Sequence, residues 1–127
     1  MADENLRCEK ELEEIPATVI LSFIARGDPV RFDHKIIKGD LDINKLDLQE
    51  EGDKFLVTSI IEIIDSRICG NVNFSKVSFR NDFDKSANFS RTIFNNNVSF
   101  YKACFCNGAE FVSSQFNKNV DFKNTSV

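Results

Sequence analysis

The feature that most constrains this chain is a phenylalanine at every fifth or sixth residue between residues 87 and 122. In the stretch ANFSRTIFNNNVSFYKACFCNGAEFVSSQFNKNVDF, the gaps between successive phenylalanines alternate between 5 and 6. Asn, Ser, Lys and small residues occupy most of the positions between them. Two successive gaps define a unit of eleven residues, and self-similarity at a fixed period is typical of repeat proteins.

The same unit extends upstream to residue 30. The segments that fit it are VRFDHKIIKGD (30–40), LDINKLDLQEE (41–51), IEIIDSRICGN (61–71), VNFSKVSFRND (72–82), ANFSRTIFNNN (87–97), VSFYKACFCNG (98–108), AEFVSSQFNKN (109–119) and the partial VDFKNTSV (120–127). We therefore expect one repeat domain over residues 30–127, with irregular insertions at 52–60 and 83–86. A separate segment, residues 1–29, precedes it.

The pattern within a unit indicates short strands with one buried face. Positions 1 and 3 are apolar, and so is position 8, while position 6 is often small. Apolar residues two apart are the signature of a half-buried strand. Eleven residues also make about three helical turns, but positions 1 and 8 would then face away from positions 3 and 6. The Asn and Gly residues at positions 9–11 are expected to form left-handed corners.

Strands this short are expected to stack coil upon coil, about 4.8 Å apart, around a tube. The large residues at positions 3 and 8 would then form a column along its axis. The sequence therefore predicts an all-β solenoid whose structural core stack consists of Ile43, Leu48, Ile63, Ile68, Phe74, Phe79, Phe89, Phe94, Phe100, Phe105, Phe111, Phe116 and Phe122.

The repeat resembles that of the pentapeptide-repeat family, whose unit is a small residue, a polar residue, a central Leu or Phe and two variable residues. The segments VNFSK, VSFRN, ANFSR, AEFVS and VDFKN match that unit. The resemblance covers residues 30–127 and implies a right-handed quadrilateral β-helix (β-solenoid) of about four coils. Two eleven-residue units would make one coil of 22 residues, two more than four regular five-residue faces. The extra residues are expected either to bulge at corners or to flatten the square.

The N-terminal segment is expected to cover one end of this tube. Residues 3–26 are predicted to be helical, with Pro16 in a first turn and Gly27 as the stop. Val19, Ile20, Phe23 and Ile24 would share an apolar face. Because the end of a solenoid exposes unpaired strand edges, we expect an N-terminal α-helical cap over residues 1–29.

Composition bears on location and on partners. No apolar run approaches the roughly 18 residues of a membrane span, and the acidic N-terminus is unlike a secretory leader, so we expect a cytoplasmic protein with reduced thiols and no membrane contact. Residues 1–29 carry seven acidic and three basic residues and thus the whole net charge of −4. The neutral repeat has no basic patch, which makes direct nucleic-acid binding an unfavoured interpretation.

No motif in the sequence predicts catalysis, a cofactor or a metal site. Cys104 and Cys106 should point outward, and His34 lies too far along the chain to complete a metal site with them. Asp40, Asp42 and Asp47 are interspersed with Lys38 and Lys45, as on a solvated face. The sequence therefore favours a non-enzymatic protein-binding or scaffold module, whose possible contact surface includes Arg91, Tyr101, Lys102 and Glu110.

Two alternative functions remain open, and so does the identity of the protein partner. Some pentapeptide-repeat proteins mimic DNA and protect or inhibit DNA gyrase, a topoisomerase, but that mimicry needs a longer and more acidic rod. The chain could also be an N-terminal or regulatory domain of a longer protein. Because the sequence stops within a unit, we further expect either such a continuation or a homodimer through the C-terminal coil, as the family resemblance implies.

Overall fold

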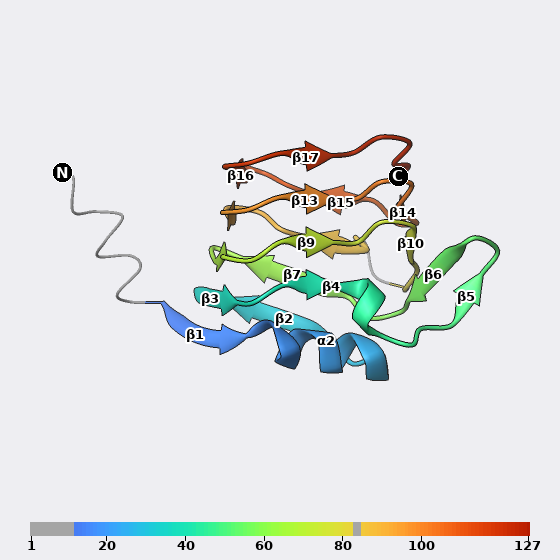
Figure 1. The fold of residues 1–127 in the computed structure, drawn as a ribbon, viewed down its shortest axis with the longest axis horizontal. Coiled ribbons are helices and arrows are strands. Elements are labelled where there is room, and N and C mark those ends of the chain that lie inside the picture. The colour runs from blue at the N-terminus through green and yellow to red at the C-terminus, as the bar shows by residue number, and fades with distance from the viewer. Residues whose placement is uncertain (1–11, 83–84) are drawn as a thin grey trace.

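The computed structural model describes residues 12–82 and 85–127 and consists mainly of short strands in parallel sheets, with one α-helix (Figure 1). Sheet A contains β1 (Glu13–Pro16), β3 (Lys35–Lys38), β8 (Arg67–Ile68), β12 (Ile93–Phe94) and β16 (Gln115–Phe116). Sheet B contains β2 (Val30–Asp33), β7 (Ile61–Ile64), β11 (Ala87–Asn88) and β15 (Ala109–Glu110). This arrangement is β-solenoid-like, as the repeat predicts.

The other two sheets complete each pass of the chain. Sheet C contains β4 (Leu41–Asp42), β9 (Val72–Asn73), β13 (Val98–Ser99) and β17 (Val120–Asp121). Sheet D contains β5 (Glu50–Glu51), β6 (Lys54–Val57), β10 (Val77–Phe79) and β14 (Cys104–Phe105). The chain visits the sheets in the order B, A, C, D, and each pass lies on the previous one (Figure 1).

The register shows how the two insertions fit. In sheet B, Val30 pairs with Ile61, Ile61 with Ala87, and Ala87 with Ala109. The last interval spans two eleven-residue units, as the repeat predicts. The other two exceed it by nine and by four positions, which are the lengths of the segments 52–60 and 83–86. Each insertion therefore lengthens a single pass and leaves the pairing of the sheets in phase.

The first pass departs from the prediction in sheet D. The segment 52–60, expected to be an interruption, supplies β6, and Val57 of this strand lies in register with Phe79. Leu48, expected at this level of the column, is only partly buried against the core. The 3-10 helix η1 (Ile43–Lys45) turns the chain first, with Asp42 Oδ1 accepting a hydrogen bond from the Asn44 N–H. The antiparallel hairpin β5–β6 then brings Val57 inward.

A column of aromatic rings fills the interior of the later passes. Phe74, Phe79, Phe89, Phe94, Phe100 and Phe105 are at most 1% exposed, and Ile43, Ile63 and Ile68 are also buried. Rings at equivalent positions stack face to face, as in Phe79–Phe105 with centroids 4.8 Å apart and Phe94–Phe116 at 4.7 Å. Phe111 and Phe116 are partly buried, whereas Phe122, the last of the predicted column, is 40% exposed.

The left-handed corners lie at position 5 of every unit except 41–51, between the two strands, and only in part at the Asn- and Gly-rich positions 9–11. The non-glycine residues with positive φ are His34, Asp65, Lys76, Arg91, Lys102, Ser113 and Asn124, all at position 5. In the last passes this residue is the third of a β-turn, closed for example by the bond from the Ala103 N–H to the Phe100 carbonyl. A positive φ there is the geometry of a type II turn.

The helix at the N-terminal end is shorter than predicted. Helix α2 spans Ala17–Arg26, and Glu13–Pro16 form strand β1, which pairs with β3. Residues 3–11 of the expected helix lie outside the described residues. Pro16 precedes the helix with an extended backbone (φ −72°, ψ 143°), which suits its position at the end of a strand.

Helix α2 packs its apolar face on the first pass of the stack (Figure 1). The buried residues are Ala17, Ile20, Leu21 and Ile24, while Val19 and Phe23 of the predicted face are only partly buried. As predicted, the helix ends at Gly27, whose φ is 74°. The N–H groups of Gly27 and Asp28 bond to Ile24 and Phe23 carbonyls, as in a Schellman motif. No helix within residues 12–82 or 85–127 has the length and apolar character needed to cross a membrane.

Candidate functional site

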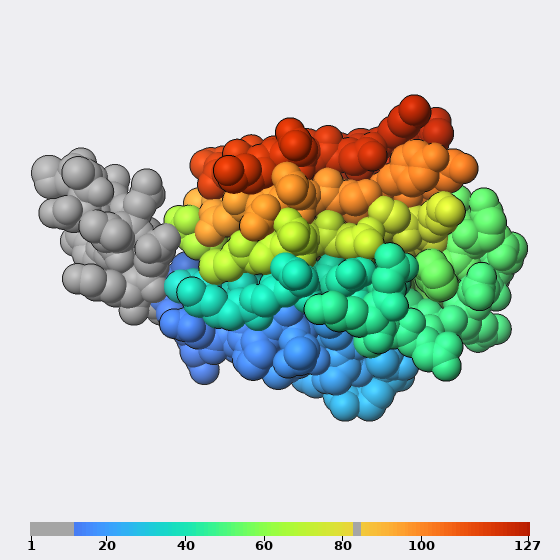
Figure 2. Space-filling model, in the orientation of Figure 1, coloured from blue at the N-terminus to red at the C-terminus, as the bar shows by residue number. Residues whose placement is uncertain are grey.

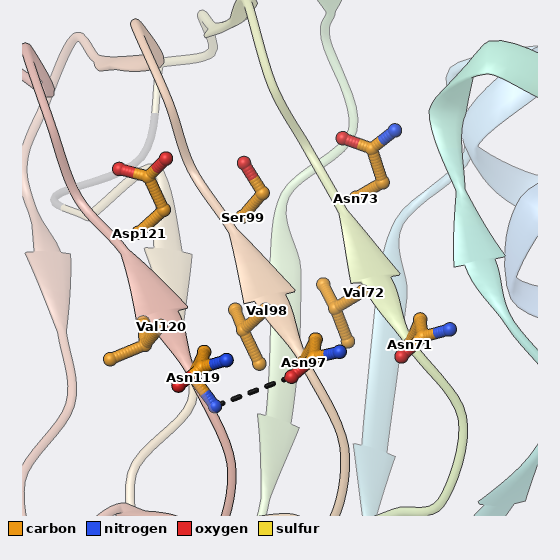
Figure 3. Close-up of a pocket in the computed structure, with 9 residues that line it drawn as sticks. All are labelled: Asn71, Val72, Asn73, Asn97, Val98, Ser99, Asn119, Val120 and Asp121. Atoms are coloured by element: carbon orange, nitrogen blue, oxygen red, sulfur yellow. Dashed lines mark hydrogen bonds between the residues drawn. The ribbon is translucent and has the colours of Figure 1, made fainter.

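An open groove of about 410 Å³ runs across the outer face of sheet C. Three rows of equivalent residues line it, as Figure 3 shows: Asn71, Asn97 and Asn119; Val72, Val98 and Val120; and Asn73, Ser99 and Asp121. The Asn119 N–H donates to Asn97 Oδ1 at 3.3 Å. Asp121 is the only ionisable residue among these nine, so the groove offers amide and hydroxyl contacts and lacks a pair of groups for acid–base catalysis.

The residues predicted to contact a partner lie in three separate places. Tyr101 and Lys102 share the turn after β13, where Lys102 Nζ is 5.4 Å from the centroid of the Tyr101 ring. Glu110 is on β15 in sheet B. Arg91 lies at the turn between sheets B and A and binds Asp65 through two hydrogen bonds of 2.8 and 3.0 Å. They form no single surface.

Asp33, His34 and Asp65 form a cluster that sequence reasoning missed. One ligand atom from each lies within 4.8 Å of the others. Both carboxylate oxygens of Asp65 already accept hydrogen bonds from Arg91. These hydrogen bonds lower the pKa of the Asp65 carboxyl. A cation at this place would compete with the Arg91 guanidinium for the Asp65 carboxylate, and in its present geometry the cluster is an ion-pair network. Asp33 pairs in register with Ile64, the residue before Asp65. His34 and Asp65 both occupy position 5 of their units, which is the sequence signal for this contact.

The other candidate groups have structural partners. Asp40 Oδ1 accepts a hydrogen bond from the Asn71 N–H, and Asp42 Oδ1 accepts one from Asn73 Nδ2. These two carboxylates therefore tie neighbouring passes together. Cys104 is half-buried and Cys106 is exposed on the outer face of sheet D, in the outward orientation that the sequence predicts.

The end formed by residues 109–127 is the least covered part of the described chain. The exposed large hydrophobic residues among those described all belong to it: Val112, Val120, Phe122 and Val127. Strands β15, β16 and β17 are the outermost strands of sheets B, A and C, so one edge of each is unpaired within residues 12–82 and 85–127. In Figure 2 this layer is red, on the side opposite the blue helix. Apolar side chains and free strand edges therefore coincide there.

Comparison of the chain with family models, with curated proteins and with solved structures found no match in any of the three.

Proposed function

We propose that this chain is a non-enzymatic protein-binding module of the pentapeptide-repeat type, folded as a right-handed quadrilateral β-helix, which binds through the end formed by residues 109–127. The observation that carries the proposal is the concentration of exposed Val112, Val120, Phe122 and Val127 at this end. Exposed apolar side chains that gather at one end of a soluble protein are a candidate interaction surface.

The free strand edges at this end suit pairing with another strand. An unpaired edge offers a row of backbone N–H and C=O groups, and the addition of a strand is a recurring mode of protein recognition. Phe122 stacks on Phe100 with centroids 5.3 Å apart and an interplanar angle of 7°, and it remains 40% exposed. A partner ring placed on its open side would extend the aromatic column by one level.

We propose a second copy of the chain as the occupant. A two-fold interface brings the same surface of both copies together, so like charges would face each other across a charged end. Residues 109–127 contain two acidic residues, Glu110 and Asp121, and two basic residues, Lys118 and Lys123, so the side-chain charges at this end cancel. The neutral, apolar surface therefore favours self-association.

The function of a DNA mimic that binds gyrase receives less support. Such mimicry needs a continuous acidic strip, whereas the acidic residues here alternate with bases in ion pairs. Arg31 binds Glu62 at 3.1 Å, and Arg80 binds Glu51 at 2.7 Å. The field of each carboxylate is thereby reduced along the outer faces.

Sedimentation equilibrium of the full chain tests the proposal. We expect a dimer that dissociates on dilution. Val120→Lys, which places a charge at the open end, should weaken dimerisation by at least about tenfold, the equivalent of 1.4 kcal/mol. Thr18→Lys, exposed on α2 at the opposite end, is the matched control and should leave it unchanged. A folded chain that stays monomeric at high concentration, or equal weakening by both variants, would refute self-association through this end.

A further inference from the structure

Two cysteines lie side by side on the outer face of sheet D. Phe105 points inward and is 1% exposed, so the residues before and after it both point outward. The Sγ atoms of Cys104 and Cys106 are 3.7 Å apart. A disulfide bond measures about 2.05 Å, so the two sulfurs need to approach by only about 1.7 Å.

The neighbouring strand places polar groups around Cys106. Ser78, which pairs with Cys104 in register, has its Oγ 3.6 Å from Cys106 Sγ. The guanidinium of Arg80, which binds Glu51 at 2.7 Å, also interacts with the same sulfur. Burial opposes ionisation of Cys106, but hydrogen bonds from Ser78, Cys104 and Arg80 and the charge of Arg80 outweigh it and lower the pKa of this thiol. The thiolate is the nucleophilic form of cysteine, and a nearby arginine favours it.

The backbone around the pair is held in place. The Phe105 N–H donates to the Ser126 carbonyl at 2.9 Å, and the Cys106 N–H donates to the Phe79 carbonyl at 3.0 Å. These bonds connect the strand to both neighbouring passes. The two sulfurs therefore stay close without any rearrangement of the fold.

Cys69 provides an internal reference. It occupies the same position of its repeat unit as Cys106, but it lies after β8 in sheet A. The residues two positions away are Arg67 and Asn71, so Cys69 lacks the adjacent thiol that Cys106 has. Its Sγ lies 4.0 Å from Asn95 Nδ2. The two cysteines thus share a place in the repeat and differ in their surroundings.

We propose that Cys104 and Cys106 form a reversible dithiol–disulfide site that reacts with hydroperoxides, with Cys106 as the attacking thiolate and Cys104 as the resolving thiol. This site lies on the outer face of sheet D and is independent of the proposed binding through residues 109–127.

The chemistry balances in two steps. The Cys106 thiolate attacks one peroxide oxygen, the O–O bond breaks, and the other oxygen leaves as hydroxide or alkoxide; the sulfur becomes a sulfenic acid. Cys104 then attacks this sulfur, the S–S bond forms, the S–O bond breaks, and the hydroxyl leaves with the Cys104 proton as water. The dithiol loses two electrons and the peroxide gains them. A reducing dithiol restores both thiols by exchange.

The test uses the full chain carrying Cys8→Ser, so that Cys69 is the only other thiol. The reduced protein is treated with hydrogen peroxide and its tryptic peptides are followed by mass spectrometry. We expect the peptide 103–118 to lose the mass of two hydrogen atoms and to regain it with dithiothreitol. Oxidation of Cys69 should be slower by at least about tenfold, because it lacks the same activation.

Variants separate the two roles. With Cys104→Ser, Cys106 should accumulate as a sulfenic acid that dimedone traps, whereas Cys106→Ser should reduce oxidation of Cys104 to the rate of Cys69. Arg80→Gln should slow the reaction of Cys106 by about three- to tenfold through loss of thiolate. Arg91→Gln, which removes an ion-paired arginine on another face, is the matched control and should not slow it.

Three results would overturn the proposal. They are equal oxidation rates for Cys106 and Cys69, a dimedone adduct that accumulates on Cys106 while Cys104 is present, and a disulfide formed only between two chains. The first comparison is made within one chain and needs no variant at the pair. Circular dichroism before treatment checks that each variant retains the fold.

Discussion

The two ends of this stack of strands are covered differently. At the N-terminal end, α2 and β1 lie over the first pass, and Ile20 and Ile24 are 0% and 2% exposed. At the other end, nothing among the described residues lies over the last pass, and Val120 and Phe122 are 37% and 40% exposed. The repeat can add passes indefinitely, because each exposes the edges that the next one pairs with. A non-repetitive segment is needed to cover an end.

The largest expected effect compares the middle of the aromatic column with its open end. Phe100 is fully buried and contacts the rings of Phe74, Phe105 and Phe122. Phe100→Ala should lower the free energy of unfolding by about 3–5 kcal/mol through loss of burial and a residual cavity. Phe122→Ala, at the exposed end, should lower it by less than about 2 kcal/mol. Urea denaturation of dilute protein measures both, and equal losses would contradict an inside–outside difference.

The next effect concerns the covered end. Ile20→Ala removes a fully buried side chain from the contact between α2 and the first pass. We expect a loss of about 2–5 kcal/mol in the free energy of unfolding. Thr18→Ala, exposed on the same helix, is the control and should change it by less than about 0.5 kcal/mol. If both substitutions had the same small effect, α2 would not stabilise the end that it covers.

A smaller effect concerns the ion pair of Arg91 with Asp65, which lies within the stack, away from both ends. Because the hydrogen bonds from Arg91 lower the pKa of Asp65 in the folded state, this pair stabilises the protein fully above the ordinary Asp pKa of about 3.9. The contribution is lost as the pH falls through the lowered pKa. Since the Arg91 side chain is about half exposed, solvent screens the pair, and Arg91→Gln should cost much less stability at pH 7 than Ile20→Ala does.

Chemical denaturation of the parent chain and of Arg91→Gln at several pH values measures this contribution. The difference between the two should shrink towards zero under strongly acidic conditions. A difference that grew as the pH fell would show that another group is responsible.

The smallest expected change in stability concerns the turns of the last two passes. Lys102 and Asn124 occupy equivalent positions, each with a φ of 57°. Asn tolerates this left-handed conformation better than most residues, so Lys102→Asn should raise the free energy of unfolding by up to about 1 kcal/mol. Lys102→Ala keeps the same backbone strain and should change it by less than about 0.5 kcal/mol. Thermal unfolding of the two variants measures the difference, and a more stable Ala variant would contradict the role of φ.

Much of the interior could be predicted because it follows a local rule. In a strand, residues two apart share a face. Phe94 and Phe105 each follow the small residue at position 6 of their unit by two positions, and this was enough to place them inside. The same rule placed Cys104 and Cys106 outside. Leu48 fitted the rule and still lies beside the column, because the preceding 3-10 helix turned the chain and β6 took its place.

The candidate sites depend on contacts that no local rule contains. The contact of Arg80 with Cys106 and that of Arg91 with Asp65 each join residues from neighbouring passes. These contacts depend on the register between passes. At this level, the sequence separation of paired residues is two repeat units plus the four residues of 83–86. A shift of one residue would turn each side chain to the opposite face.

By itself the sequence determined the period, most of the inward residues and the stop of the helix at Gly27, since these follow from neighbours a few residues apart. The tertiary structure alone decided which strand completes the first pass, where the left-handed turns lie and which charges meet across passes. The physical reason is that backbone pairing between passes fixes the register, and the register brings distant side chains together.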